Sequence, residues 1–257
     1  MKIVFWSPTP YSGRKTSNLL LMAYAAAEEG GEQLLLHADA TGSGPEHFLL
    51  SGRNRSRMLL KREFGVELLD KLLRCNRFGK ELVVNAAYSF AEERLHILPA
   101  GTEYFYRDTL AEESIVGMIR QADKVFQNVW VEAPAGESFL KSALFAEADL
   151  VVVNFSQSPG EIEKAVLPPV EDKMFFLMGA YEKRCAYNKH NIRQLYSVLQ
   201  GRFEVIPYQN RYLSSCCQGE AEAFLNRGSI LGEEDALYPF FREVKKAYAA
   251  MKRYKAV

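Results

Sequence analysis

Short apolar runs recur along the chain and alternate with longer stretches in which apolar residues have helical spacing. The runs of strand length are 3–6, 33–36, 95–98, 128–131, 150–153, 174–177 and 203–206. Most are continuously apolar rather than alternating, which is typical of parallel strands buried on both faces. Helices are expected over 17–29, 66–76, 109–122, 137–146, 160–166, 191–200, 218–226 and 233–254. This order predicts an α/β fold, a doubly wound and mainly parallel sheet of about seven to eight strands with helices on both faces.

The composition is that of an ordinary globular protein, with 257 residues of which 48% are hydrophobic and 25% charged. No linker rich in Ser, Gly or Pro and no repeat interrupts the chain, so residues 1–257 are expected to form a single domain. The 32 Lys and Arg balance the 32 Asp and Glu, and this zero net charge argues against a molecule that binds polyanions as a whole. Nucleic acid is therefore not an expected partner. The basic segment 52–62 is better explained as a solvated surface than as a phosphate-binding patch.

The sequence contains neither a recognisable membrane span nor a signal peptide. The longest apolar run, 19–27, is far shorter than the ~20 residues that cross a bilayer. The apolar start at 3–6 is followed at once by the polar segment SPTP, so a cytoplasmic location is expected. The thiols lack the spacing of a metal or redox motif and are expected to be reduced and buried. They are Cys75, Cys185, Cys216 and Cys217.

The C-terminal stretch, about 233–254, combines basic residues with apolar positions at helical spacing. The apolar positions are Phe241, Val244, Tyr248 and Met251. A helix that docks on the core explains this pattern. The alternative is a basic amphipathic helix that lies on an anionic membrane surface, which would make the protein peripheral to the membrane.

The first predicted strand leads into a polar segment and then into the first helix, which is the context of a phosphate-binding loop. In such a loop, backbone N–H groups and the helix N-terminus hold phosphates, a Lys neutralises them, and a Ser or Thr hydroxyl binds Mg²⁺. Lys15 and Thr16 fit the last two roles. The candidate nucleotide-binding residues of the loop are Ser12, Gly13, Arg14, Lys15, Thr16 and Ser17.

The glycines that usually shape this loop are mostly absent. Counted back from Lys15, Thr9 and Arg14 stand where the pattern G-x-x-x-x-G-K-[ST] has glycine, and Pro10 removes one amide donor. Only Gly13 remains, although glycine provides positive φ and close backbone approach. Taken alone, the segment is equally well explained as an unrelated Lys-Thr at the start of a helix.

Later segments follow one another in the order found in the ParA/MinD family of ATPases. Segment 34–43, LLLHADATGS, resembles that family's second strand and first switch, with Asp39 as the second acid and His37 in place of the first. Segment 95–101, LHILPAG, resembles its L-x-[VIL]-L-P-[AS]-G motif. Segment 129–136, VWVEAPAG, resembles its second switch, with Glu132 in place of Asp.

Two further segments extend the resemblance toward the C-terminus. Segment 146–153, AEADLVVV, is similar to the strand that follows the second switch, and 205–208, VIPY, resembles the strand end that lines the base pocket. The resemblance therefore covers nearly the whole chain. It implies a P-loop NTPase of Rossmann-like architecture that binds ATP with Mg²⁺ and closes as a homodimer over two nucleotides.

The resemblance also assigns roles to individual residues. Asp39 would position the attacking water, Glu132 would hold Mg²⁺ through water, Thr16 would bind Mg²⁺, and Pro207 would line the base pocket. Two family residues are replaced. Pro10 stands where a signature Lys reaches across the dimer, and Gly179 stands where an Asn recognises adenine.

The first loop is most similar to a subgroup that reads S-P-x-x-G-x-x-G-T-T-S-N and resembles TadZ and CpaE, atypical members that position pilus machinery. This likeness implies protein partners in a localisation or pilus assembly. Three functions stay open: a nucleotide-dependent switch with slow or absent hydrolysis, a pseudo-ATPase scaffold, and a metabolic ATP-dependent synthetase of the same superfamily. We favour the switch, with nucleotide binding better supported than efficient turnover.

Overall fold

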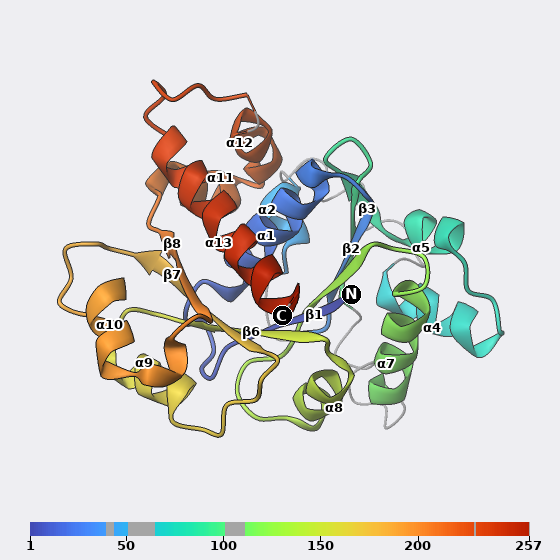
Figure 1. Ribbon diagram of the computed structural model, residues 1–257. Coiled ribbons are helices and arrows are strands. Elements are labelled where there is room, and N and C mark those ends of the chain that lie inside the picture. Colours follow the sequence, from blue (N-terminus) through green and yellow to red (C-terminus); the bar gives the residue numbers. More distant parts are fainter. Residues whose placement is uncertain (40–43, 51–64, 101–110, 229, 257) are drawn as a thin grey trace.

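The protein is built around one sheet of eight strands, shown by a computed structural model that describes residues 1–39, 44–50, 65–100, 111–228 and 230–256 (Figure 1). The strands are β1 (Lys2–Trp6), β2 (Gln33–His37), β3 (Tyr88–Phe90), β4 (Leu95–Leu98), β5 (Asn128–Glu132), β6 (Leu150–Phe155), β7 (Met174–Tyr181) and β8 (Phe203–Pro207). Their order is β3-β4-β2-β5-β1-β6-β7-β8, and all pairs are parallel except β3 with β4. The predicted fold class is confirmed.

Each central strand is buried on both faces, which explains its continuous apolar sequence. In β1, Ile3 and Phe5 belong to one hydrophobic core, whereas Val4 and Trp6 belong to the other. Alternate side chains of a strand point to opposite faces, so a two-sided strand needs apolar residues at every position.

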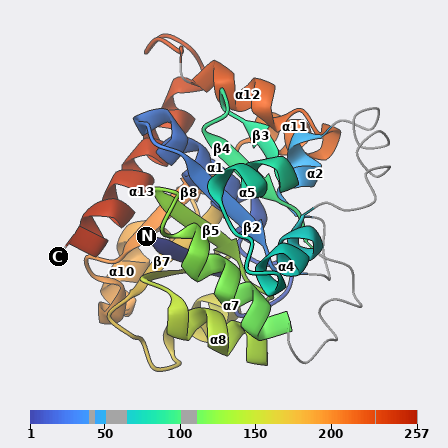
Figure 2. The ribbon, with the colours of Figure 1, turned by 90° about the vertical axis from the view of Figure 1, so that its right-hand side faces the viewer.

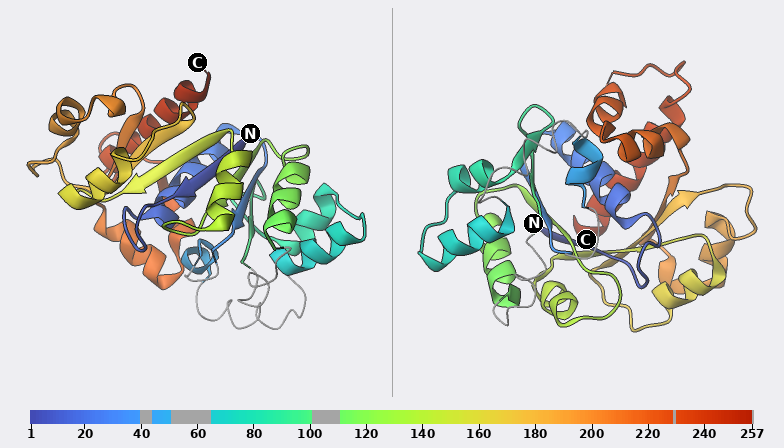
Figure 3. Two further views of the ribbon diagram at one scale, coloured as in Figure 1. Left: turned by 90° about the horizontal axis from the view of Figure 1, so that it is seen from below. Right: turned by 180° about the vertical axis from the view of Figure 1, so that it is seen from behind.

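Helices cover both faces of the sheet (Figures 1, 2 and 3). One face carries α4 (Val66–Arg74), α5 (Lys80–Ala86), α7 (Ala111–Ala122), α8 (Phe139–Glu147), α9 (Pro159–Val166), α10 (Lys189–Leu195) and the short 3₁₀ helix η1 (Ser197–Leu199). The other carries α1 (Lys15–Glu29), α2 (Glu46–Leu49), α11 (Asn210–Gln218), α12 (Ala221–Gly228) and α13 (Tyr238–Ala256). The strand order reverses at β1, and α/β proteins bind ligands beyond the carboxyl ends of strands at such a point.

Several boundaries differ from the sequence prediction. Helix α1 begins at Lys15 rather than at 17, which places Lys15 and Thr16 in its first turn. The helix expected over 218–226 corresponds to α12, which begins only at Ala221, because Gly219 at φ 72° ends the preceding helix α11 in a left-handed conformation. Strand β3 and the helices α2, α5 and α11 were not predicted. Residues 109–110 of the expected helix 109–122 and the basic segment 52–62 lie outside the described residues.

The C-terminal helix α13 docks on the core. Its apolar residues Phe241, Val244, Tyr248 and Met251 are buried beside α1 and the sheet, so the face proposed for lipid is already covered by protein. Among the described helices, none combines the length and apolar character that a bilayer span requires.

The four thiols are free, as expected, but the prediction that they are buried holds for one of them. Cys216 is buried, Cys185 is half-buried, and Cys75 and Cys217 are exposed. Cys75 and Cys217 lie at or near helix ends, where the chain is covered on one side only.

Candidate functional site

The loop between β1 and α1 presents free backbone donors. In the described part of the chain, no hydrogen bond uses the N–H groups of residues 11–14. Helix α1 follows directly, and its N-cap residue Arg14 offers no side-chain cap to the first turn. Unsatisfied N–H groups and the positive end of the helix dipole together favour an anion at this place.

Gly13 allows this loop to lie close to the sheet. It has φ 64°, and a Cβ atom at this position would lie 2.4 Å from the backbone N of Phe155 at the end of β6. Asn18 fixes the same point, because its Nδ2 donates to the carbonyl of Gly13 at 2.8 Å and to Oδ1 of Asn154 at 3.0 Å. Asn154 is fully buried, and its polar side chain within the otherwise apolar strand LVVVNF is the signal by which it could have been found from sequence.

Lys15 points toward the strand ends, where the predicted acids lie. Its Nζ donates to the carbonyl of Ala133 and lies 3.5 Å from Oδ2 of Asp39 and 3.6 Å from Oε1 of Glu132. The Lys15 side chain is 8% exposed. The structure therefore brings together three residues that the sequence placed in one site.

Thr16 is joined to the same carboxylate. Its Oγ1 donates to Oε1 of Glu132 at 2.5 Å. The other oxygen of Glu132, Oε2, is buried and has no hydrogen-bond partner among the described residues. A buried carboxylate oxygen without a donor is costly, and a cation or its bound water would satisfy it.

Thr16 and Glu132 fit a Mg²⁺ site in which phosphate oxygens supply further ligands. No cluster of three or more His, Cys, Asp or Glu side chains in the described ranges is arranged to hold a metal by itself. Mg²⁺ commonly takes only one or two protein oxygens and completes its shell with water and substrate phosphates. The Thr16 hydroxyl and the Glu132 carboxylate supply oxygens of that kind.

His37, at the end of β2, has its own acidic partner. Its Nδ1 lies 3.3 Å from Oε1 of Glu46, the first residue of α2, and its Nε2 lies 3.9 Å from Oε2 of Glu132. Burial opposes the charged imidazole, but the hydrogen bond with Glu46 and the charge of Glu132 outweigh it and raise the pKa of His37 above its ordinary value. Glu46 was not singled out in the sequence because no motif surrounds it.

The hydroxyls of Ser12 in the loop and Ser17 in α1 both donate to protein groups. Ser12 donates to Oε2 of Glu161, in the first turn of α9, and Ser17 donates to the carbonyl of Arg14 at 3.0 Å. Residues 40–43 of the first-switch motif and Gly101 lie outside the described residues.

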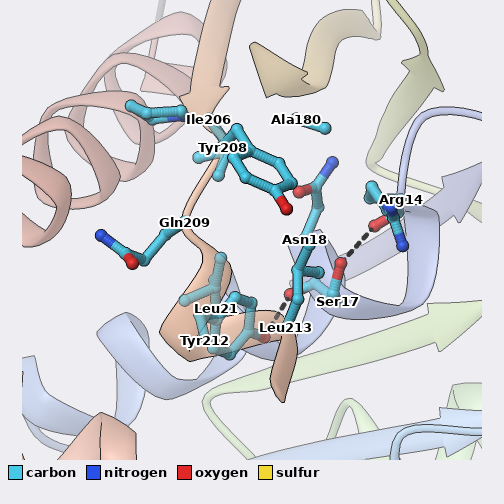
Figure 4. Close-up of a pocket in the computed structure, with 11 residues that line it drawn as sticks. Arg14, Ser17, Asn18, Leu21, Ala180, Ile206, Tyr208, Gln209, Tyr212 and Leu213 are labelled. Carbon is cyan, nitrogen blue, oxygen red and sulfur yellow. Dashed lines mark hydrogen bonds between the residues drawn. The ribbon is translucent and has the colours of Figure 1, made fainter. Parts of the chain in front are cut away.

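Pro207 lines a small cavity beside the loop, together with Arg14, Ser17 and Tyr208. Figure 4 shows the last three of these side chains around the cavity. The cavity encloses about 20 Å³. This volume suits about one water molecule and is far below the ~300–1,000 Å³ of small-molecule pockets. A base at this position requires the cavity to widen.

Gly179, the position of the expected Asn, packs against the loop. A Cβ atom there would lie 2.2 Å from the carbonyl oxygen of Gly13 and 2.7 Å from Nδ2 of Asn18. The backbone arrangement leaves no space for a side chain. Glycine at this position therefore permits the close approach of β7 to the loop.

Solved structures resemble this chain over its whole length. A ParA family ATPase from Chlorobium tepidum TLS matches with a TM-score of 0.70 and 12% identity over 100% of this chain and 99% of that chain. MinD in a MinC:MinD complex from Aquifex aeolicus matches at 0.69 with 17% identity, covering 98% and 96%. MinD complexed with Mg-ADP from Pyrococcus horikoshii OT3 matches at 0.69 with 13% identity, covering 99% of each. The chain has the fold of ParA and MinD ATPases. No family model and no curated protein matches the sequence.

Proposed function

We propose that this protein belongs to the ParA/MinD family and is a nucleotide-dependent switch that binds ATP with Mg²⁺ in the loop after β1. The observation that carries the proposal is the convergence of Lys15, Thr16 and Glu132 at the carboxyl ends of the strands, next to a loop with free amides. The fold supports it, since a structural neighbour is MinD complexed with Mg-ADP.

Each residue has a role in this proposal. Lys15 would exchange its contacts with Asp39 and Glu132 for phosphate oxygens, and Thr16 and Glu132 would hold Mg²⁺, directly and through water. Mg²⁺, when bound, neutralises phosphate charge. Asp39, released from Lys15, would orient the attacking water.

Other residues would hold the rest of the nucleotide. Residues 12–14 would offer amides to the phosphates, and the Arg14 side chain, which lines the same cavity as Pro207, would add a positive charge. Ser17 stabilises the first turn of α1 through its hydrogen bond to the carbonyl of Arg14.

Calorimetric titration and thermal unfolding with ATP·Mg²⁺ test nucleotide binding. The expected result is a saturable heat and a rise in melting temperature, because a ligand that binds only the folded state stabilises it. Lys15→Ala should abolish both responses. Lys183→Ala, at an exposed lysine far along the chain, should leave them unchanged. Absence of heat and of stabilisation at millimolar ATP would disprove the proposal.

The second candidate is a scaffold that has lost turnover. It is favoured by Pro10 at the position of the family's trans-acting Lys and by His37 in place of an acid. Single-turnover phosphate release distinguishes the two functions. Slow release that Asp39→Ala abolishes supports a weak ATPase, and binding without release supports the scaffold. The metabolic synthetase requires turnover that depends on an added carboxylic acid.

We further propose that the protein acts as a homodimer in intracellular positioning, in the manner of TadZ and CpaE in pilus localisation. Light scattering should show a dimer with ATP·Mg²⁺ and a smaller species without it. Protein partners are expected, as MinC is for MinD in the Aquifex aeolicus complex. The apolar face of α13 is covered by the core, so any contact with a membrane would be made by the outward lysines and arginines of this helix. Sedimentation with anionic vesicles tests that contact.

A further inference from the structure

The loop after β1 adopts a conformation that its side chains disfavour. Tyr11 has φ 59° and Arg14 has φ 57°, in the left-handed region, as does Gly13 at φ 64°. Residues other than glycine seldom adopt this region because Cβ crowds the backbone. Such a conformation persists only where surrounding contacts fix it.

Contacts already described fix the second half of the loop. Asn18 holds the carbonyl of Gly13, and Ser17 holds the carbonyl of Arg14. Neither contact reaches Tyr11, whose side chain is 95% exposed and therefore does not anchor the turn. The first half of the loop needs another anchor.

Glu161 supplies that anchor from α9. A single oxygen, Oε2, accepts hydrogen bonds from the hydroxyl of Thr9 at 2.5 Å and from the hydroxyl of Ser12. These two residues flank Pro10 and Tyr11, so one carboxylate joins both sides of the turn. The Glu161 side chain is only 18% exposed, and Lys164 lies 3.8 Å from its other oxygen. Hydrogen bonds to an ionised acceptor in such a place are stronger than neutral ones.

We propose that Glu161 is a positioning residue that holds the nucleotide loop in its anion-binding shape and compensates for the glycines that the loop lacks. The expected effect on nucleotide affinity rests on the proposed function. The hydrogen bonds from Thr9 and Ser12 to Glu161 do not depend on nucleotide. A purely local role in α9 is the competing explanation, because a carboxylate in the first turn of a helix also favours its dipole.

Four variants separate these explanations by titration with ATP·Mg²⁺. Glu161→Ala should weaken binding about tenfold or more, because the loop then loses its preorganisation. Glu161→Gln keeps an acceptor oxygen for Thr9 and Ser12 and should stay close to the unaltered protein. Tyr11→Gly in the Glu161→Ala background should restore most of the affinity, because glycine adopts positive φ without an anchor. Glu163→Ala, at an exposed position of the same helix, is the matched control and should change nothing.

Amide hydrogen exchange without nucleotide provides a readout that does not depend on the proposed function. Glu161→Ala should speed exchange about tenfold or more at the two hydrogen-bonded amides that hold the ends of the loop, while the rest of the described helices keep their protection. These are the amide of Gly136, which donates to the carbonyl of Ser7, and the amide of Asn18, which donates to the carbonyl of Arg14. If affinity and exchange are unchanged in Glu161→Ala, or if Tyr11→Gly restores neither, the positioning role is wrong. If the unaltered protein binds no ATP yet the exchange effect appears, the proposed function fails and the role of Glu161 in shaping the loop stands.

Discussion

His37 and Glu132 lie opposite each other in the β2–β5 ladder, with the imidazole Nε2 3.9 Å from the carboxylate Oε2. The pair is buried at the carboxyl edge of the sheet, next to Lys15 and Thr16. A histidine in this position brings a titratable group next to the carboxylate that Lys15 and Thr16 contact. The stability of the protein should therefore depend on pH near neutrality.

The pKa of His37 is raised above its ordinary value of 6.5, despite burial, by Glu46 and Glu132. The folded state binds the proton more tightly than the unfolded state, so this contribution to the free energy of unfolding is complete below about pH 6.5. It is lost as the pH rises through the raised pKa. Urea unfolding across this range should show that loss, and His37→Gln should remove it. His190→Gln, at an exposed histidine, is the control and should keep the pH dependence of the free energy of unfolding. If His37→Gln kept the same pH dependence as the unaltered protein, the assignment to His37 would be contradicted.

His96 should show the opposite dependence. Burial lowers its pKa and outweighs its contact with Glu32, whose Oε2 lies 3.3 Å from Nε2. The unfolded state therefore takes up the proton first, and the stabilising contribution is lost as the pH falls below about 6.5 through the lowered pKa. In His96→Gln, the free energy of unfolding should depend less on pH below about pH 6.5. The dependence above that pH, which comes from His37, should remain. Nuclear magnetic resonance titration of both imidazoles gives the two pKa directions independently.

Much of this arrangement could be predicted from sequence, because two-sided burial forces continuous apolar strands. Lys15 and Thr16 were placed in the site by the context of a phosphate-binding loop, and Asp39 and Glu132 by the resemblance to the ParA/MinD family. Strand β3 was missed because its three residues lie at the sheet edge, where burial does not impose a pattern. Glu161 was missed for another reason. Its partners lie about 150 positions earlier, and only the packing of α9 against the loop creates the contact.

Gly179→Ala should disturb the loop between β1 and α1, although Gly179 lies far from that loop in the sequence. The added methyl group would meet the carbonyl oxygen of Gly13 at 2.2 Å, a backbone atom that must then shift. We expect a loss of about 1–3 kcal/mol in the free energy of unfolding and weaker ATP·Mg²⁺ binding. Gly160→Ala is the control, because its Cβ meets nothing within 4 Å and alanine favours the helix α9. Equal effects of the two substitutions would show that the close approach of β7 to the loop does not matter.

Lys15→Met should destabilise the protein even without nucleotide. The ammonium lies within 3.6 Å of two largely buried carboxylates, and its replacement removes the positive charge that Asp39 and Glu132 share. Breaking a buried ion pair by removing one partner costs up to about 3–5 kcal/mol, and the partial exposure of Asp39 favours the lower end. Glu132→Gln in the same chain should recover part of the loss, because the amide keeps an acceptor for Thr16 and removes one charge. Urea unfolding of the two single variants and the double variant gives the coupling energy, expected at about 1–3 kcal/mol. A coupling near zero would mean that Lys15 and Glu132 do not interact in solution, and would remove the electrostatic basis of the proposed site.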